Sequence, residues 1–251
     1  RDRDVTGVQT CALPIFIKLK NHGEKSMIAT LVCPEHGKIV GFINGAHSKR
    51  GLGIYQLGNY ISFNAYARVE ENMLSLKGVE LMEAHTADFM LDTDKIGALS
   101  SLCRLLDVCV AENDNLGSFY KVIKDFFQHI HEDNWLVYYS FFEYYLLDFL
   151  GVGLDVSECA VTGKTNDLSY ISPKTGCAVC TKVGEPYKDK LYAYPHYIVD
   201  KNYRPQRAEV ADLLAMTGGF LTKNFLAGHN LQLPEKRANL LNSVKKYQMK
   251  M

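Results

Sequence analysis

The sequence predicts an α+β, multidomain protein, with an N-terminal β-barrel of the OB-fold type followed by an all-α helical bundle that carries a zinc-knuckle-like insertion. Three observations support this prediction. Short runs of alternating apolar and polar residues fill residues 16–83. From residue 84 onwards the apolar spacing changes to three and four, which is typical of amphipathic helices. A stretch rich in glycine and cysteine then interrupts the helical pattern at about residues 155–190.

The first fifteen residues, RDRDVTGVQTCALPI, do not belong to this pattern. They begin without methionine, lack the charge and apolar core of a signal peptide, and resemble a translated sequencing adapter. We therefore interpret residues 1–15 as a non-native, adapter-like segment and expect the first native residues of the barrel to be missing. The predicted domains are residues 16–83 for the barrel and residues 84–251 for the helical domain.

The barrel prediction depends on five short strands within fewer than 70 residues. Each has β-rich composition or a period of two, and turn residues separate them. A small closed barrel is the usual solution for so many short strands, and the OB-fold is the common version with a nucleic-acid-binding face. The predicted strands are Phe16–Lys20, Met27–Cys33, Lys38–Asn44, Tyr60–Val69 and Met73–Met82.

Helical spacing governs most of the remaining chain. Residues 87–111 and 116–131 each repeat apolar residues every three or four positions and should pack as a bundle. Residues 134–150, NWLVYYSFFEYYLLDFL, are apolar almost all round, which indicates a central helix. An alternative interpretation of so many aromatic residues is that they line a groove for a partner peptide.

Two further helices are predicted towards the C-terminus. The helical pattern of residues 207–225 is expected to break at Gly218 and Gly219. Pro234 opens the last helix at a favoured early position. That helix is expected to have a basic face, which either helps to hold DNA or is simply solvated, and its cations are Lys236, Arg237, Lys245 and Lys246.

Composition and charge narrow the class of protein. Of the 251 residues 47% are hydrophobic, and no apolar run approaches the roughly 20 residues of a membrane span, so we expect a soluble protein. The net charge is zero, yet residues 16–83 carry +2, residues 84–169 carry −9 and residues 220–251 carry +5. This distribution would let one surface meet phosphate while another meets a protein.

The barrel contains the ingredients of a single-strand binding site, namely cations for the backbone and aromatic faces for the bases. Tyr55 and Tyr60 are further aromatic candidates near this surface. The alternative is an ordinary solvated surface with unremarkable lysines. The candidate DNA-binding residues are Lys18, Lys20, Lys25, Lys38, Lys49, Arg50, Tyr66 and Arg68.

The cysteine stretch resembles a structural zinc site with one ligand missing. Cys177 and Cys180 form a C-x-x-C pair, but the upstream pair has Cys159 followed by Thr162 where a second cysteine would stand. Zinc binding would then need water or a distant histidine such as His196 as the fourth ligand. A redox or nucleophilic role for Cys177 or Cys180 is the alternative.

Several short motifs, together with their order and spacing along the chain, resemble those of the RecO family of bacterial DNA repair and recombination mediators. In the predicted helical domain they are GVGLD at residues 151–155, CAVTG at 159–163, LSYISPKTG at 168–176 and GEPY at 184–187. In the predicted barrel they are NHGEKS at residues 21–26, EHGK at 35–38 and the basic loop GAHSKR at 45–50. In that family the first cysteine pair is often complete, and many members have lost some or all of the cysteines.

The resemblance implies a function without covalent chemistry. A RecO-like protein would bind and anneal single-stranded DNA, act with RecR and single-stranded-DNA-binding protein, and help to load RecA in the RecF pathway, in the bacterial cytoplasm near the nucleoid. Contact with double-stranded DNA is also expected. The sequence has no P-loop, dinucleotide-binding, H-E-x-x-H or G-x-S-x-G motif, so we do not expect an enzyme. The alternative is a protein-interaction adaptor with a weak or vestigial nucleic-acid face.

Overall fold

The computed structural model describes residues 6–9, 13–48, 51–67, 73–200 and 202–246. The chain forms two compact units, residues 1–130 (the first unit) and residues 131–251 (the second unit). Neither contains, among the described residues, a helix long and apolar enough to cross a membrane.

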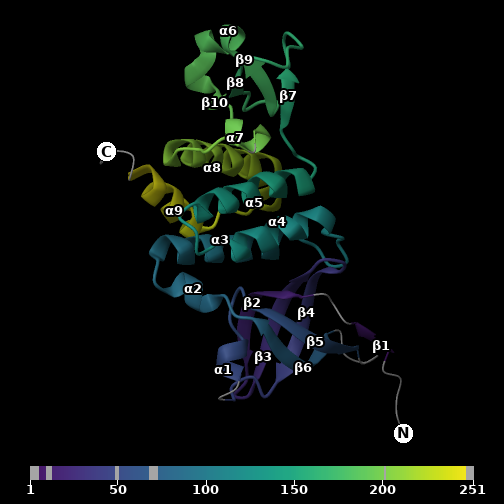
Figure 1. Ribbon diagram of the computed structural model, residues 1–251. Helices are drawn as coiled ribbons and strands as arrows, with labels where there is room; N and C mark the ends of the chain where they lie inside the picture. Colours follow the sequence, from purple (N-terminus) through teal and green to yellow (C-terminus); the bar gives the residue numbers. More distant parts are fainter. Residues whose placement is uncertain (1–5, 10–12, 49–50, 68–72, 201, 247–251) are drawn as a thin grey trace. The chain divides into compact units, whose positions relative to one another are not determined.

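A closed β-barrel forms the greater part of the first unit (Figure 1). Following hydrogen-bonded neighbours round the wall, the strand order is β2, β3, β4, β6, β5 and back to β2. Every neighbouring pair is antiparallel except β4 and β6, which run parallel. The barrel strands are β2 (Ile15–His22), β3 (Ser26–Cys33), β4 (Gly37–Asn44), β5 (Tyr60–Ala67) and β6 (Leu74–Glu83).

These strands confirm the barrel of OB-fold type that the sequence predicts. A short strand, β1 (Thr6–Gln9), pairs with β5 outside the closed wall. It falls within the segment interpreted as adapter-like, and β2 begins at Ile15, one residue earlier than predicted. Ile15 is fully buried and pairs with Tyr60, and this contact closes the barrel between β2 and β5.

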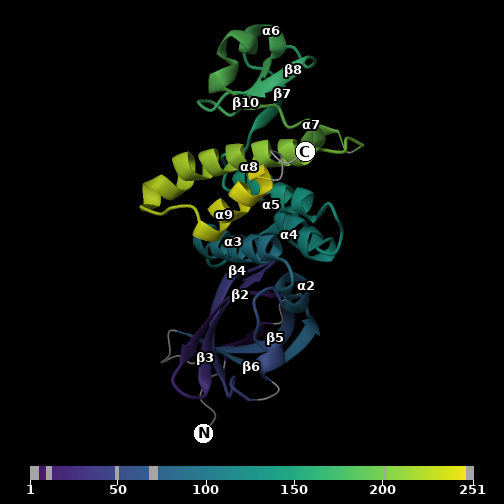
Figure 2. The same cartoon turned by 90° about the vertical axis from the view of Figure 1, so that its left-hand side faces the viewer.

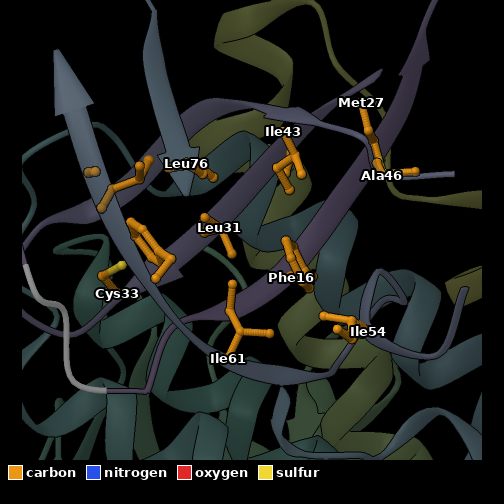
Figure 3. Close-up of a cluster of buried hydrophobic side chains, with 13 residues drawn as sticks. Phe16, Met27, Leu31, Cys33, Ile43, Ala46, Ile54, Ile61 and Leu76 are labelled. Atoms are coloured by element: carbon orange, nitrogen blue, oxygen red, sulfur yellow. The ribbon is translucent and has the colours of Figure 1, made fainter. Parts of the chain in front are cut away.

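Alternation along the strands builds the barrel interior (Figure 3). Every second residue of β3 and β4 points inward, which leaves the intervening residues on the outer face. Gly41 of β4 is required because a Cβ atom there would lie 2.5 Å from Cγ of Leu76, so the opposite wall comes too close for a side chain. The cluster contains Phe16, Met27, Ala29, Leu31, Cys33, Ile39, Ile43, Ala46, Ile54, Ile61, Phe63, Ala65 and Leu76.

Helices complete the first unit. Residues 87–111, predicted as one helical segment, form two helices, because the chain turns at Leu91 before Asp92 caps the next helix by accepting hydrogen bonds from the N–H groups of Asp94 and Lys95. The helices of this unit are α1 (Gly51–Ile54), α2 (Thr86–Met90), α3 (Thr93–Cys109) and α4 (Gly117–Gln128).

The turn between β3 and β4 fixes the barrel to the chain that follows α3. The Lys38 N–H donates to the Ala111 carbonyl at 2.9 Å, and the Leu116 N–H donates to the Pro34 carbonyl at 2.9 Å. Gly37 has a φ of +59°, and a Cβ atom there would lie 2.5 Å from the Ala111 carbonyl oxygen. Only glycine suits this turn.

The second unit contains a helical layer and a small sheet (Figure 2). The aromatic segment forms α5, whose buried side chains confirm its interpretation as a core helix. The α8 helix continues through Gly218 and Gly219, so the predicted break there is wrong. The long helices are α5 (Trp135–Phe149), α8 (Arg207–Leu221) and α9 (Glu235–Lys246), and α9 begins directly after Pro234 as predicted.

The predicted insertion forms a four-stranded sheet in the order β10, β8, β9, β7. Its strands are β7 (Asp155–Cys159), β8 (Leu168–Ile171), β9 (Cys177–Cys180) and β10 (Tyr192–Ala193). Short helical segments lie between these elements in the chain. The segments α6 (Thr181–Gly184) and η1 (Glu185–Lys190) connect β9 to β10, α7 (His196–Val199) lies between β10 and α8, and η2 (Thr222–Leu226) and η3 (Ala227–His229) follow α8.

Candidate nucleic-acid interface

The outer face of β2, β3 and β4 gathers cations beside apolar side chains. Register places Lys20 opposite Ile28 and Ile28 opposite Phe42, which makes one row across the three strands. The next row contains Lys18, Thr30 and Val40. We call these two rows, together with His22 and Lys38, the barrel face; the strands that form it lie side by side in Figure 2.

An aromatic pair lies at one end of the barrel face. The rings of His22 and Phe42 meet edge to face, with their centroids 5.6 Å apart. Phe42 is half-buried and His22 is exposed, and the exposed Lys20 belongs to the same row as Phe42. Phe42 is absent from the predicted site, although its outward position between the inward Gly41 and Ile43 was the available signal.

Lys18 and Lys38 converge at the other end of the barrel face, where α3 passes. The Lys18 ammonium lies 2.9 Å from Oδ2 of Asp107, and the Lys38 ammonium donates to the Asp107 backbone carbonyl at 2.9 Å. Arg104, one turn earlier on α3, also contacts Oδ2 of Asp107, at 3.0 Å. These two lysines therefore contact α3 as well as facing solvent.

The other predicted DNA-binding residues do not join this face. Lys25 is exposed in the turn between β2 and β3. Tyr66 lies on β5, on another part of the barrel wall, where the Lys77 ammonium lies 5.1 Å from its ring centroid. Lys49, Arg50 and Arg68 lie outside the described residues.

Two tyrosines considered for base stacking contribute to packing instead. Tyr60 is 1% exposed, and its ring packs against His85 and Phe127. Burial, followed by the charges of nearby carboxylates, raises the pKa of its hydroxyl. Tyr55 is half-buried and meets Phe16 edge to face. The Tyr60 ring is therefore not available as a stacking surface, whereas the Tyr55 ring remains partly exposed.

The cysteines of the predicted zinc site do not converge. The Cys180 N–H donates to the Cys159 sulfur at 3.3 Å, which joins these two residues, whereas the Cys177 thiol donates to the Thr175 carbonyl. Residues three apart on a strand face opposite sides, so Cys177 points away from Cys180. Within the described part of the chain no three Cys, His, Asp or Glu side chains are arranged to hold a metal. The donor set therefore does not fit zinc.

The Cys159 thiol nevertheless keeps an unusual environment. Burial raises its pKa, but hydrogen bonds from the Thr162 side chain and from the N–H groups of Cys180, Val161 and Thr162 oppose burial and lower the pKa to about 6. The pattern stabilises a thiolate. These hydrogen bonds join Cys159, the last residue of β7, to the turn that follows it and to Cys180 of β9. They therefore include one cysteine from each half of the predicted zinc site.

The basic face predicted for the last helix is also smaller than expected. Lys236, Lys245 and Lys246 are exposed on α9, but Arg237 is only 3% exposed. Its guanidinium contacts both carboxylate oxygens of Glu143, at 3.0 and 2.8 Å. Arg237 is thus part of the core and does not face solvent.

Comparison with known proteins identifies the family of this chain. The model of "Recombination protein O N terminal" matches residues 14–85, and that of "Recombination protein O C terminal" matches residues 90–229. The "DNA repair protein RecO" of Bartonella quintana is 32% identical over 232 residues, covering 90% of this chain and 93% of that protein. The protein of the same name from Rhodospirillum centenum is 32% identical over 234 residues, covering 92% and 93%. The chain belongs to the RecO family of DNA repair proteins.

Proposed function

We propose that this chain is a non-enzymatic recombination mediator that binds and anneals single-stranded DNA through the barrel face. Membership of the RecO family supports a role in DNA repair. The observation that carries the finer proposal is the row of Lys20, Ile28 and Phe42 with His22 packed beside it. It combines a cation for the phosphates with an aromatic surface for the bases.

Annealing requires no bond to be made or broken within the protein. Two complementary strands repel each other through their phosphates, and cations on a protein surface reduce that repulsion. Stacking on an aromatic side chain accepts any base and is reversible, so the strands can still find their register. A face with lysines and a partly exposed aromatic pair meets both requirements.

The proposal extends to the partners of a mediator. We infer that the chain acts with RecR, meets single-stranded-DNA-binding protein on coated strands and helps to load RecA in the RecF pathway, in the bacterial cytoplasm close to the nucleoid. Contact with double-stranded DNA fits the same cations, because both forms of DNA present phosphates. The family membership supports these assignments.

Fluorescence anisotropy with a labelled single-stranded oligonucleotide, measured across a salt series, tests DNA binding. Phe42→Ala should weaken binding about 5- to 150-fold, which corresponds to the loss of about 1–3 kcal/mol of stacking on one base. Lys20→Ala should reduce the log–log salt slope by about 0.7, as expected for one phosphate contact on a single strand. Both variants should also slow the annealing of complementary labelled strands.

Lys121→Ala is the matched control, since Lys121 is an exposed cation of the first unit on α4. It should leave affinity and salt slope unchanged, and circular dichroism should show that all variants are folded. Folded wild-type protein without salt-dependent DNA binding would exclude the mediator proposal. Retained binding to RecR in that case would favour a protein-interaction adaptor.

A further inference from the structure

The contact between α3 and the barrel places three cations around a single carboxylate. Lys18 comes from β2, Lys38 from β4 and Arg104 from α3, and all three contact Asp107. Only the Lys18 and Arg104 side chains contact its carboxylate, because Lys38 donates to the backbone carbonyl instead. We call these four residues the α3 corner.

The α3 corner carries more positive charge than its own carboxylate can neutralise. Three cations and one anion leave a net charge of +2 on side chains drawn from three elements. The Lys18 and Arg104 side chains are each 52% exposed, whereas that of Asp107 is 13% exposed. Solvent therefore reaches Lys18 and Arg104 more readily than the carboxylate that they contact.

The α3 corner shares Lys18 and Lys38 with the barrel face. Lys18 belongs to the row beside that of Lys20, Ile28 and Phe42. Lys38 stands four residues before Phe42 on the same strand and on the same outer side, which is roughly 13 Å along the strand. A strand of nucleic acid bound near Phe42 would therefore reach the corner within a few nucleotides.

We propose that the α3 corner is a phosphate-binding subsite that extends the DNA path from the barrel onto α3. A DNA phosphate takes the place of the Asp107 carboxylate as the anion that Lys18 and Arg104 contact, while Lys38 stays held by the backbone carbonyl. Asp107 thus acts as an internal competitor that weakens DNA binding and keeps the cations in position when DNA is absent. This subsite rests on the proposed function of the barrel face.

The competition predicts opposite effects for two substitutions in the corner. Asp107→Asn removes the competing charge and should tighten binding of a single-stranded oligonucleotide about two- to fivefold, the range expected for an exposed ion pair. Arg104→Gln removes one phosphate contact and should lower the log–log salt slope by about 0.7. The ratio of the Kd of Arg104→Gln to the wild-type Kd should therefore be about 2.6-fold larger at about 50 mM salt than at about 200 mM salt.

Glu80→Gln is the matched charge control, because Glu80 is exposed on β6 and lies opposite Ser62 of β5. It changes the net charge as Asp107→Asn does, so a general charge effect would tighten binding equally in both variants. Thermal unfolding should show each variant to be folded at the temperature of the binding assay. Arg104→Gln tests the subsite while leaving Asp107, whose side chain is only 13% exposed, unchanged.

The outcomes separate this subsite from the function on which it rests. Tighter binding by Asp107→Asn than by Glu80→Gln, with a shallower salt slope for Arg104→Gln, supports the subsite. Wild-type affinity and slope in both corner variants, while Phe42→Ala loses affinity, would overturn the subsite and leave the barrel face as the DNA site. A wild-type protein that binds no DNA would overturn both proposals.

Discussion

A carboxylate and a guanidinium are buried together in the second unit. Glu143 of α5 is fully buried, and its two oxygens accept hydrogen bonds from Arg237 of α9, from the Tyr139 hydroxyl at 2.8 Å and from the Thr217 hydroxyl at 2.5 Å. The Arg237 guanidinium also donates to the Leu214 backbone carbonyl. Each charge has several partners, as a buried ion pair requires.

Loss of one partner from this pair should be costly. Arg237→Met would leave the Glu143 carboxylate buried without its cation, and we expect the free energy of unfolding to fall by about 3–5 kcal/mol. Urea denaturation followed by circular dichroism measures this change. The exposed neighbour gives the control, because Lys236→Met should change stability by less than about 0.5 kcal/mol. Equal effects of the two substitutions would contradict the importance of the ion pair.

The sequence could not distinguish Arg237 from its basic neighbours. Lys236, Lys245 and Lys246 are exposed as expected, and a helical arginine beside them has the composition of the same solvated face. The residue that holds Arg237, Glu143, lies 94 positions earlier within an aromatic helix. No local pattern links two residues so far apart, so only the packing of α9 against α5 and α8 reveals their pairing.

Among the elements, α8 depends on a glycine at its contact with α9. A Cβ atom on Gly218 would lie 2.6 Å from Nη1 of Arg237, whose guanidinium is held in place by Glu143. Gly219, the next residue, comes close to the Tyr192 hydroxyl. The glycines permit close approach of neighbouring side chains and do not end the helix.

Gly218→Ala should therefore destabilise the protein although alanine favours helices by about 1 kcal/mol over glycine. The added methyl group must displace a buried guanidinium, and we expect a lower midpoint of thermal unfolding. Gly228→Ala is a suitable comparison, since a Cβ atom there meets nothing within 4 Å and Gly228 has no positive φ. An increase in the midpoint for Gly218→Ala would show that Arg237 moves aside without cost.

The spacing of apolar residues predicts most of the elements. A strand that buries one face repeats apolar residues every two positions, and a helix that buries one face repeats them about every 3.6 positions. Strands β2 to β6 and helices α4, α5 and α9 all lie within a few residues of their predicted positions. The sequence does not predict the sheet of β7 to β10, because its strands are only two to five residues long. In the candidate site the charge of the lysines and the alternation of β4, which turns Phe42 outward, can be read from the sequence, whereas the place of Arg104 follows only from the packing of α3 beside the barrel.

At the scale of the whole molecule, the chain contains two units, each with its own buried residues. The family models divide the chain between residues 85 and 90, whereas compactness divides it between Ile130 and His131, so α3 and α4 match the C-terminal model and pack within the first unit. The boundary predicted from the sequence, between residues 83 and 84, marks the change from strand to helix periodicity. Periodicity does not report which elements pack into one compact unit.

Separate cores predict separate local stabilities. In hydrogen-exchange mass spectrometry, Arg237→Met should reduce the protection of α5, α8 and α9 while leaving the protection of β2 to β6 close to the wild-type level. Lys236→Met should leave both units unchanged. A parallel loss of protection in the barrel would mean that the two units unfold as one cooperative body.

The pairing of β1 with β5 has a consequence for behaviour at high concentration. Strand β5 meets β2 only near Tyr60, and further along the same edge it pairs with β1 at Ala65 and Ala67. Unpaired strand edges are templates on which other chains assemble into aggregates. Thr6–Gln9 covers this length of the edge and belongs to the segment interpreted as adapter-like, so a chain without it should expose the edge of β5 and aggregate more readily at high concentration.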